Sequence, residues 1–341
     1  MARADLLKKL FQSYQQRDDQ AFQDAAQQII DEERRKHHPV VANELQRTLK
    51  TDLMNHDQYT QDTTLGPLPK DNDRQAPLVH IQYPQRYLQD LVLDEQIRHH
   101  LNRIITEFRE WEVLEANGLT PVRRILFCGP SGCGKTATAQ ALASELALPL
   151  LYVRFDAVVS SLLGETAANL RKVFEFACRG QWVMFFDEFD AIGRSRDDPT
   201  EHGEIKRVVN SFLQILDSFN GRSLAIAATN FERSLDPAIW RRFDEIVRFE
   251  KPSPAQIQIL IRHHLASSRI TEDGIDKLAA QLTGSTHADV ERTTLDIRRS
   301  VAIRGIATIL DEDISDAIER LNYRRSIMKQ VDDTPHMVDK E

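Results

Sequence analysis

Residues 129–136 read GPSGCGKT, a glycine-rich stretch that ends in a lysine and a threonine. Glycines allow a loop to turn its backbone N–H groups inward around phosphate oxygens. Lys135 can reach the outer phosphates of a nucleotide, and the Thr136 hydroxyl can bind Mg²⁺. A strand-like run precedes the loop and a helix-like run follows it, so the helix would point its positive end at the same phosphates. This pattern predicts a binding loop for a nucleoside triphosphate and Mg²⁺.

Residues 182–190 read WVMFFDEFD, so two adjacent acids follow a short apolar run. The apolar run predicts a buried strand that ends at the acids. We expect Asp187 to hold Mg²⁺, directly or through water, and Glu188 to polarise the attacking water. The alternative is a strand that ends in a solvated acidic turn.

Two further polar groups follow later in the chain. Residues 224–230 read LAIAATN, so Asn230 ends another strand-like run and could orient the water or contact the terminal phosphate. Arg241 and Arg242 stand together in the stretch LDPAIWRRFDE. We expect them to face away from the phosphate loop of their own subunit and to stabilise phosphoryl transfer in a neighbour. The alternative is a surface salt-bridge pair.

The elements that must position these residues alternate along the chain. Strand-like runs lie at 124–128, 150–154, 182–187 and 224–229, with a weaker one at 245–249. Helix-like stretches include 94–115, 135–147, 165–178 and 203–218. Such alternation predicts an α/β fold, a doubly wound parallel sheet with helices on both faces.

The rest of the chain predicts helical units and connecting segments. We expect a small helical N-terminal domain at 1–55, which is either a recognition module or a structural appendage, and a flexible linker at 56–87. After the α/β domain at 88–251 the pattern is helical throughout, which predicts a second, smaller domain at 252–326. Residues 327–341 form a polar tail.

Composition limits the classes of function. The chain has 341 residues and a net charge of −8, which does not favour a dedicated DNA binder. No apolar run approaches the length of a membrane span, and the charged N-terminus does not resemble a secretory signal. Cys128, Cys133 and Cys178 have no paired spacing, which indicates reduced thiols, a cytoplasmic location and no zinc site. The histidine pairs at 37–38, 99–100 and 263–264 are interpreted as parts of solvated helix faces.

The chain from about 88 to 325 resembles the AAA family of ATPases within the AAA+ superfamily. GPSGCGKT is similar to Walker A, FFDE to Walker B, ATN to sensor 1, and LDPAIWRRFD to the second region of homology, in the family's order and spacing. The resemblance implies ATP hydrolysis, an α/β core, a helical lid, and a ring, usually of six subunits, with ATP at the subunit interfaces. The layout is similar to that of compact bacterial members with a small helical N-terminus.

The resemblance also assigns roles to residues of this chain. Glu188 and Asn230 would be catalytic, together with Arg241 and Arg242 as arginine fingers of the neighbouring subunit. Asp187 and Thr136 would hold Mg²⁺. The residues that bind ATP would be Gly129, Pro130, Ser131, Gly132, Cys133, Gly134, Lys135, Thr136, Ala137, Asp187 and, in the lid, Ala288.

Four departures from the family pattern bear on function. The two arginines are adjacent, so which one is the main finger is open. His287 replaces a glycine near the adenine, and Leu93 stands where a glycine is common. Leu162 and Leu163 occupy the pore positions at which protein-threading relatives have an aromatic residue and an apolar one, which predicts a softer grip on a polypeptide.

These features predict a ring-forming ATPase that remodels or regulates a protein partner, recruited by the N-terminal helices. A rival interpretation is a nucleotide-switched scaffold or regulator of an effector or protease, without translocation of a polypeptide. A DNA-directed motor is the third possibility, and nothing basic or aromatic enough for a nucleic-acid channel is visible in the pore segments.

Overall fold

The computed structural model describes residue 28 and residues 66–71, 75–158, 163–189, 199–230, 237–305 and 308–332. The chain divides into two compact units, Met1–Pro67 and Leu68–Glu341, and nearly all described residues belong to the second. The helical domain predicted for residues 1–55 therefore lies outside the described residues, apart from Gln28. Among the described residues, no helix is long and apolar enough to cross a membrane.

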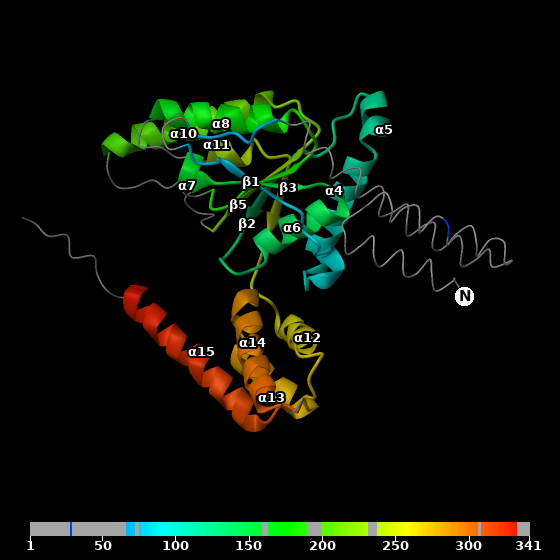
Figure 1. The fold of residues 1–341 in the computed structure, drawn as a ribbon, viewed down its shortest axis with the longest axis vertical. Coiled ribbons are helices and arrows are strands. Elements are labelled where there is room, and N and C mark those ends of the chain that lie inside the picture. Colours follow the sequence, from blue (N-terminus) through cyan, green and yellow to red (C-terminus); the bar gives the residue numbers. More distant parts are fainter. Residues whose placement is uncertain are drawn as a thin grey trace, which may run out of the picture. The chain divides into compact units, whose positions relative to one another are not determined.

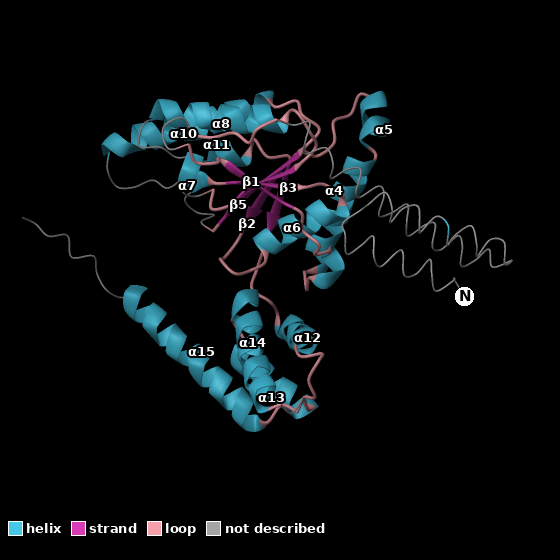
Figure 2. Ribbon diagram, viewed as in Figure 1, coloured by secondary structure: helices cyan, strands magenta, loops and turns pink. Residues whose placement is uncertain are grey.

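The second unit contains a six-stranded sheet in the order β1-β3-β4-β5-β2-β6. Figures 1 and 2 show the sheet with helices packed around it. The strands are β1 (Val79–Gln82), β2 (Arg124–Cys128), β3 (Leu150–Val153), β4 (Val183–Phe186), β5 (Leu224–Thr229) and β6 (Glu245–Arg248). Strands β2 to β6 pair in parallel, and only β1 is antiparallel to its neighbour β3. The predicted α/β class and parallel sheet are confirmed.

Helices cover both faces of this sheet (Figure 1). They are α4 (Glu95–Arg109), α5 (Trp111–Ala116), α6 (Lys135–Glu145), α7 (Phe155–Val158), α8 (Leu163–Ala177), α10 (Pro199–Ser218) and α11 (Pro237–Trp240), with a 3-10 turn at Leu88–Asp90. On one face Phe185 of β4 packs in a core with residues of α4 and α6. On the other, Phe186 stacks on Phe174 of α8 and meets Phe212 of α10 edge to face, with ring centres 5.6 and 5.2 Å apart.

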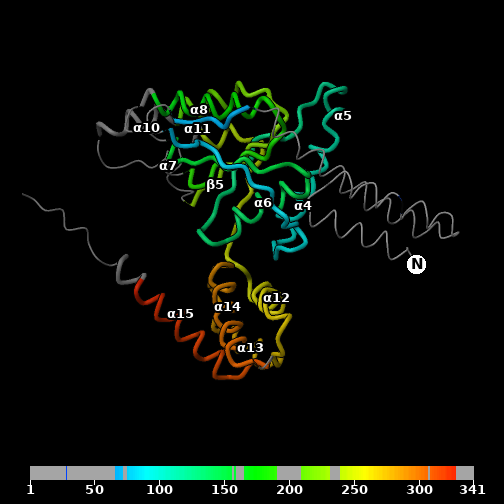
Figure 3. Tube along the Cα trace, viewed as in Figure 1, coloured from blue at the N-terminus to red at the C-terminus, as the bar shows by residue number. Residues whose placement is uncertain are grey.

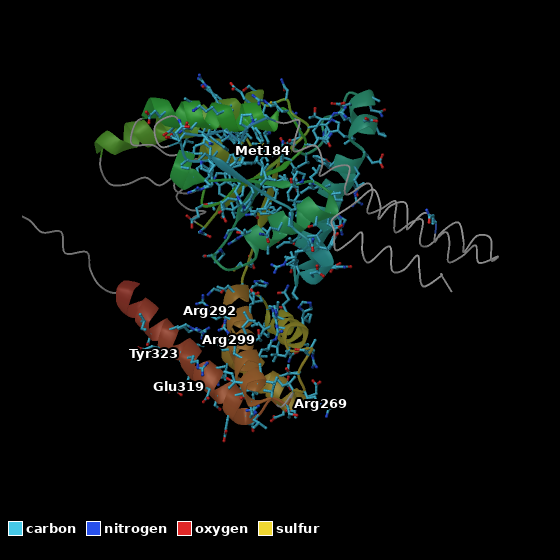
Figure 4. The ribbon with its side chains drawn as sticks, in the orientation of Figure 1. Met184, Arg269, Arg292, Arg299, Glu319 and Tyr323 are labelled. Atoms are coloured by element: carbon cyan, nitrogen blue, oxygen red, sulfur yellow. The ribbon has the colours of Figure 1, made fainter. Side chains whose placement is uncertain are left out.

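Burial on both faces explains why β4 and β5 are apolar throughout. Every residue of both strands is buried, including Met184, which is labelled in Figure 4. The polar residues Asp187 and Asn230 come directly after these two paired strands. The apolar sequence therefore ends at the same edge of the sheet in both, and this brings the polar side chains together.

The buried side chains of the C-terminal helices form a core of their own, and Figure 3 shows the path of these helices. They are α12 (Pro254–His264), α13 (Glu272–Leu282), α14 (His287–Arg304) and α15 (Asp311–Asp332). Capping boxes at Ser253 and Thr286 begin α12 and α14. Buried Asp296 of α14 accepts hydrogen bonds from Arg299 and from Arg324 of α15, at 2.9 and 3.2 Å, and so joins the two helices.

Two segments differ from the sequence prediction. Residues 79–82 were assigned to the flexible linker, but they form β1, and Leu78 and Val79 are buried there. A four-residue strand at the edge of a sheet carries too short an apolar pattern to be recognised in a polar segment. Helix α15 runs to Asp332, beyond the predicted end at residue 326, because no glycine or proline interrupts residues 326–332.

Candidate active site

The loop 129–136 connects β2 to α6, and its glycines are required by the backbone. Gly129 has φ +137°, and a Cβ there would lie 2.1 Å from the carbonyl oxygen of Phe249. Gly134 has φ +96° and forms the N-cap of α6. Side chains are excluded at these positions, so the loop can present its backbone N–H groups and the helix N-terminus to a phosphate.

Lys135 is buried at the start of α6 and its ammonium group is held by three oxygens. The Nζ atom donates to the carbonyl oxygens of Gly129 and Pro130, at 2.7 and 2.9 Å, and to Oδ1 of Asn230, at 2.7 Å. The structure therefore brings together the lysine of the glycine-rich loop and the asparagine that follows β5. A phosphate oxygen can accept hydrogen bonds from the same ammonium group.

Thr136 of the loop and Asp187, which follows β4, are in contact. The Thr136 hydroxyl donates to Oδ2 of Asp187 at 3.0 Å. A hydroxyl and a carboxylate are oxygen ligands of the kind that Mg²⁺ binds, and Mg²⁺ takes its remaining ligands from phosphates and water. No group of three or more His, Cys, Asp or Glu side chains able to hold a metal occurs in the described ranges. The pair fits Mg²⁺ bound together with a nucleotide.

Glu188 follows on a turn with an unusual backbone. Its φ is +52°, in the left-handed region that few residues other than glycine adopt, and its side chain is exposed. The turn is held on both sides, because the N–H of Glu188 donates to Oδ1 of Asp187 at 2.9 Å and the N–H of Phe189 donates to the carbonyl of Ala228 at 2.8 Å. The left-handed turn sets Glu188 apart from the strand, at the rim of the site.

The side chains described above, namely Lys135, Thr136, Asp187, Glu188 and Asn230, line a cleft of about 420 Å³. Its walls come from the glycine-rich loop, from residues 90–93, and from helices α12 and α14. The lining residues are Arg86, Asp90, Leu91, Val92, Leu93, Ser131, Gly132, Cys133, Gly134, Lys135, Thr136, Ala137, Thr138, Asp187, Glu188, Asn230, Leu260, His263, His264, His287, Ala288 and Glu291. The predicted nucleotide residues Ala137 and Ala288 are thus part of one cleft with the loop.

The C-terminal helices contact the loop directly. The N–H of Ala288 donates to the carbonyl of Gly132 at 3.0 Å. A Cβ on Gly132 would lie 3.0 Å from the Cβ of Ala288 and 3.0 Å from Oγ1 of Thr286, so only glycine fits between the loop and α14 without a shift. The start of α14 therefore packs on the glycine-rich loop.

Burial changes the ionisation of several side chains in the cleft. It raises the pKa of the Cys133 thiol and lowers the pKa of His264 and of His287. Both imidazoles are thus held toward their neutral form.

The sequence interpretation missed the part of the cleft that α12 and residue 86 contribute. His263 and His264 were interpreted as parts of a solvated helix face. His263 is exposed, as interpreted, whereas His264 is half-buried, and both line the cleft. The spacing of Leu260, His263 and His264, at i, i+3 and i+4, places them on one side of α12 and was the available signal. Arg86 had no such signal, because it lies in the segment assigned to the linker.

The two predicted arginine fingers lie after α11 and are exposed, and neither is among the residues that line the cleft. Arg242 forms an ion pair with Asp217 of α10, and Asp217 also pairs with Arg124 at 3.2 Å. Arg241 makes no ion pair or hydrogen bond among the described residues. The salt-bridge interpretation therefore describes Arg242 and not Arg241.

The pore prediction is untested. Leu162 lies outside the described residues, and Leu163 is described only as the first residue of α8.

Comparison with known proteins identifies the family of this chain. Residues 125–251 match the family described as "ATPase family associated with various cellular activities (AAA)". "Uncharacterized AAA family ATPase y4kL" of Sinorhizobium fredii is 40% identical over 328 residues, which are 96% of this chain and 97% of that protein. The crystal structure of the FIGL-1 AAA domain superposes with a TM-score of 0.56 at 22% identity, over 71% of this chain and 85% of that chain, and it supports the fold.

Larger relatives share only part of their length. "ATP-dependent zinc metalloprotease FtsH 3" of Sphaerobacter thermophilus is 32% identical over 76% of this chain and 54% of that protein. "Proteasome-activating nucleotidase" of Thermococcus onnurineus is 32% identical over 67% of this chain and 59% of that protein. The chain thus spans about half of these two relatives and nearly the whole of the first. It belongs to the AAA family and is an ATPase.

Proposed function

We propose that this ATPase assembles into a ring and uses ATP hydrolysis to remodel or regulate a protein partner. The observation that carries the proposal is the location of Arg241 and Arg242, which are exposed and do not line the cleft of their own subunit. Phosphoryl transfer gains from a cationic group at the terminal phosphate, and a second subunit can supply it.

The residues of the cleft divide the chemical work. Lys135 and the backbone N–H groups of the glycine-rich loop hold the phosphates, and Thr136 and Asp187 hold Mg²⁺, which supplies charge neutralisation when bound. Glu188 accepts the proton of the attacking water from the rim of the cleft. Asn230, now hydrogen-bonded to Lys135, orients the terminal phosphate or the water.

Arg241 is the better candidate for the main finger. Arg242 is already paired with Asp217, so reaching a neighbouring cleft would require breaking an ion pair within its own subunit. Arg241 has no such competitor among the residues that the structure describes. Arg242 then fixes the turn that carries Arg241.

A protein is the favoured target of the motor. The names of two relatives, a metalloprotease and a proteasome-activating nucleotidase, connect similar ATPases with proteolysis. The net charge of −8 is unfavourable for a nucleic-acid target. The N-terminal domain at 1–55 would recruit the partner, and Leu162 and Leu163 would contact it in the pore.

The test uses a variant that binds ATP but does not hydrolyse it. Glu188→Gln subunits are mixed with ATP and Mg²⁺, their mass is measured by light scattering, and proteins that remain bound are identified after pull-down from the native host. The proposal requires ring-sized particles and a partner that is released or altered when wild-type protein hydrolyses ATP. A monomer under these conditions would contradict the ring. A partner that responds equally to Glu188→Gln and to wild type would favour the nucleotide-switched scaffold.

A further inference from the structure

The sheet contains one polar side chain at a place where apolar ones are the rule. Apart from the residues at their ends, strands β2, β3, β4 and β5 are apolar except for Tyr152, the third residue of β3. The ring of Tyr152 packs against the core that the sheet shares with α4 and α6, and its centre lies 5.8 Å from that of Phe185. A phenylalanine could supply the same packing, so packing alone does not explain the hydroxyl group.

The register of the sheet explains where this hydroxyl lies. Tyr152 is paired with Phe185 of the neighbouring strand β4. Side chains two residues apart along a strand share a face, and Asp187 stands two residues after Phe185. The hydroxyl oxygen of Tyr152 lies 3.5 Å from Oδ2 of Asp187. The pairing of β3 with β4 thus brings the phenol to the carboxylate that follows β4.

The carboxylate of Asp187 has hydrogen-bond donors at both of its oxygens. Oδ1 accepts the backbone N–H of Glu188 at 2.9 Å, and Oδ2 accepts the Thr136 hydroxyl at 3.0 Å. The Tyr152 hydroxyl is the third donor, and its 3.5 Å contact is long for a hydrogen bond between oxygens, so it is weaker than that of Thr136. Together the three donors restrict how the carboxylate can turn.

We propose that Tyr152 is a positioning residue for the Mg²⁺ site, because its hydroxyl holds the Asp187 carboxylate in an orientation that suits the metal. This role rests on the proposed Mg²⁺ site of Thr136 and Asp187. Tyr152 is not among the residues that line the cleft, so it acts through Asp187 and not on the nucleotide itself. A metal ligand that is already oriented by hydrogen bonds binds its metal more tightly.

The experiment measures how Mg²⁺ strengthens nucleotide binding in a background that does not hydrolyse ATP. Dissociation constants of ATP are measured by calorimetry for Glu188→Gln, with and without Tyr152→Phe, over a series of Mg²⁺ concentrations and in EDTA. Phenylalanine keeps the ring and removes only the hydroxyl. The Mg²⁺ concentration that gives half of the gain in affinity should rise about three- to tenfold, as expected for the loss of one hydrogen bond, whereas ATP binding in EDTA should be unchanged.

Turnover gives a second readout in the chain that retains Glu188. Tyr152→Phe should need about three- to tenfold more Mg²⁺ for half-maximal turnover. Its turnover at saturating Mg²⁺ should stay near that of the wild type, because the hydroxyl affects only the binding of the metal. Tyr323→Phe is the matched control, since Tyr323 on α15 is 68% exposed, and it should leave the Mg²⁺ dependence of binding and of turnover unchanged.

A purely structural role of Tyr152 predicts a different pattern. Tyr152→Phe would then lower the melting temperature without nucleotide and weaken ATP binding equally with Mg²⁺ and in EDTA. That pattern, or an unchanged Mg²⁺ dependence, would overturn the proposal. If ATP binding by Glu188→Gln itself does not depend on Mg²⁺, the Mg²⁺ site is refuted, and the role of Tyr152 with it.

Discussion

Replacing Arg241 and Arg242 one at a time should separate catalysis from stability. Arg241 has no partner in the described part of its own subunit, so Arg241→Ala should leave the melting temperature unchanged. If it is the finger, turnover should fall by about 10³-fold or more. Arg242→Ala removes an ion pair with Asp217 whose side chains are 52% and 30% exposed. A pair this exposed contributes less than about 1 kcal/mol after screening by solvent, which corresponds to a loss of at most a few degrees.

The assay measures steady-state ATPase turnover and thermal unfolding of each variant at the same protein concentration. Arg242→Ala should lose less activity than Arg241→Ala, because its effect acts through the position of the turn. Asp217→Asn is the control, since it removes the carboxylate that pairs with Arg242 and with Arg124 but leaves both candidate fingers in place, so it should lose less activity than Arg241→Ala. The reasoning is refuted if Arg241→Ala keeps its turnover, or if Arg242→Ala loses more activity than Arg241→Ala.

Three further predictions concern the pH dependence of stability, the hydrogen bond between Asn169 and Asp71, and the pore. Burial lowers the pKa of His264 and His287 in the folded protein, so the unfolded chain binds more protons below about pH 6.5. The free energy of unfolding should therefore fall as the pH decreases from about 6.5 toward the folded pKa values. A free energy of unfolding, measured by denaturant titration, that is constant across this range would contradict the prediction. Asn169→Ala removes a 2.7 Å hydrogen bond to buried Asp71 and should lower the free energy of unfolding by about 1–3 kcal/mol, measured by urea unfolding. No change would show that this hydrogen bond does not anchor the chain around Asp71. Leu162→Ala should keep basal ATPase and stability but lose stimulation by the partner, and a variant that unfolds would place Leu162 in the core instead.

The sequence predicts which polar residues gather beside the glycine-rich loop, because these residues follow strands. Parallel strands end at one edge of the sheet, so Asp187 and Asn230 are brought to the glycine-rich loop by the same rule that buries β4 and β5. The strands could be recognised because burial on both faces leaves them apolar without interruption.

The side of the cleft away from the glycine-rich loop could not be predicted in the same way. It is assembled from segments near residues 86–93, 260–264 and 287–291. No local sequence pattern indicates that these three segments lie together in the fold. His264 is polar on a helix that also carries exposed residues, so its burial depends on tertiary packing alone. The ion pair between Arg242 and Asp217 is also a tertiary contact, between residues of two different elements, and it decides which arginine is free.

One mixing experiment tests most directly whether each ATP is hydrolysed between two subunits. Lys135→Ala subunits have a defective cleft but an intact Arg241, and Arg241→Ala subunits have an intact cleft but no finger. Each variant alone should be almost inactive. An equal mixture should recover turnover, since about a quarter of the interfaces in randomly mixed rings pair an intact cleft with an intact Arg241. A mixture no more active than its two components, under conditions where both assemble together, would contradict hydrolysis at a shared site.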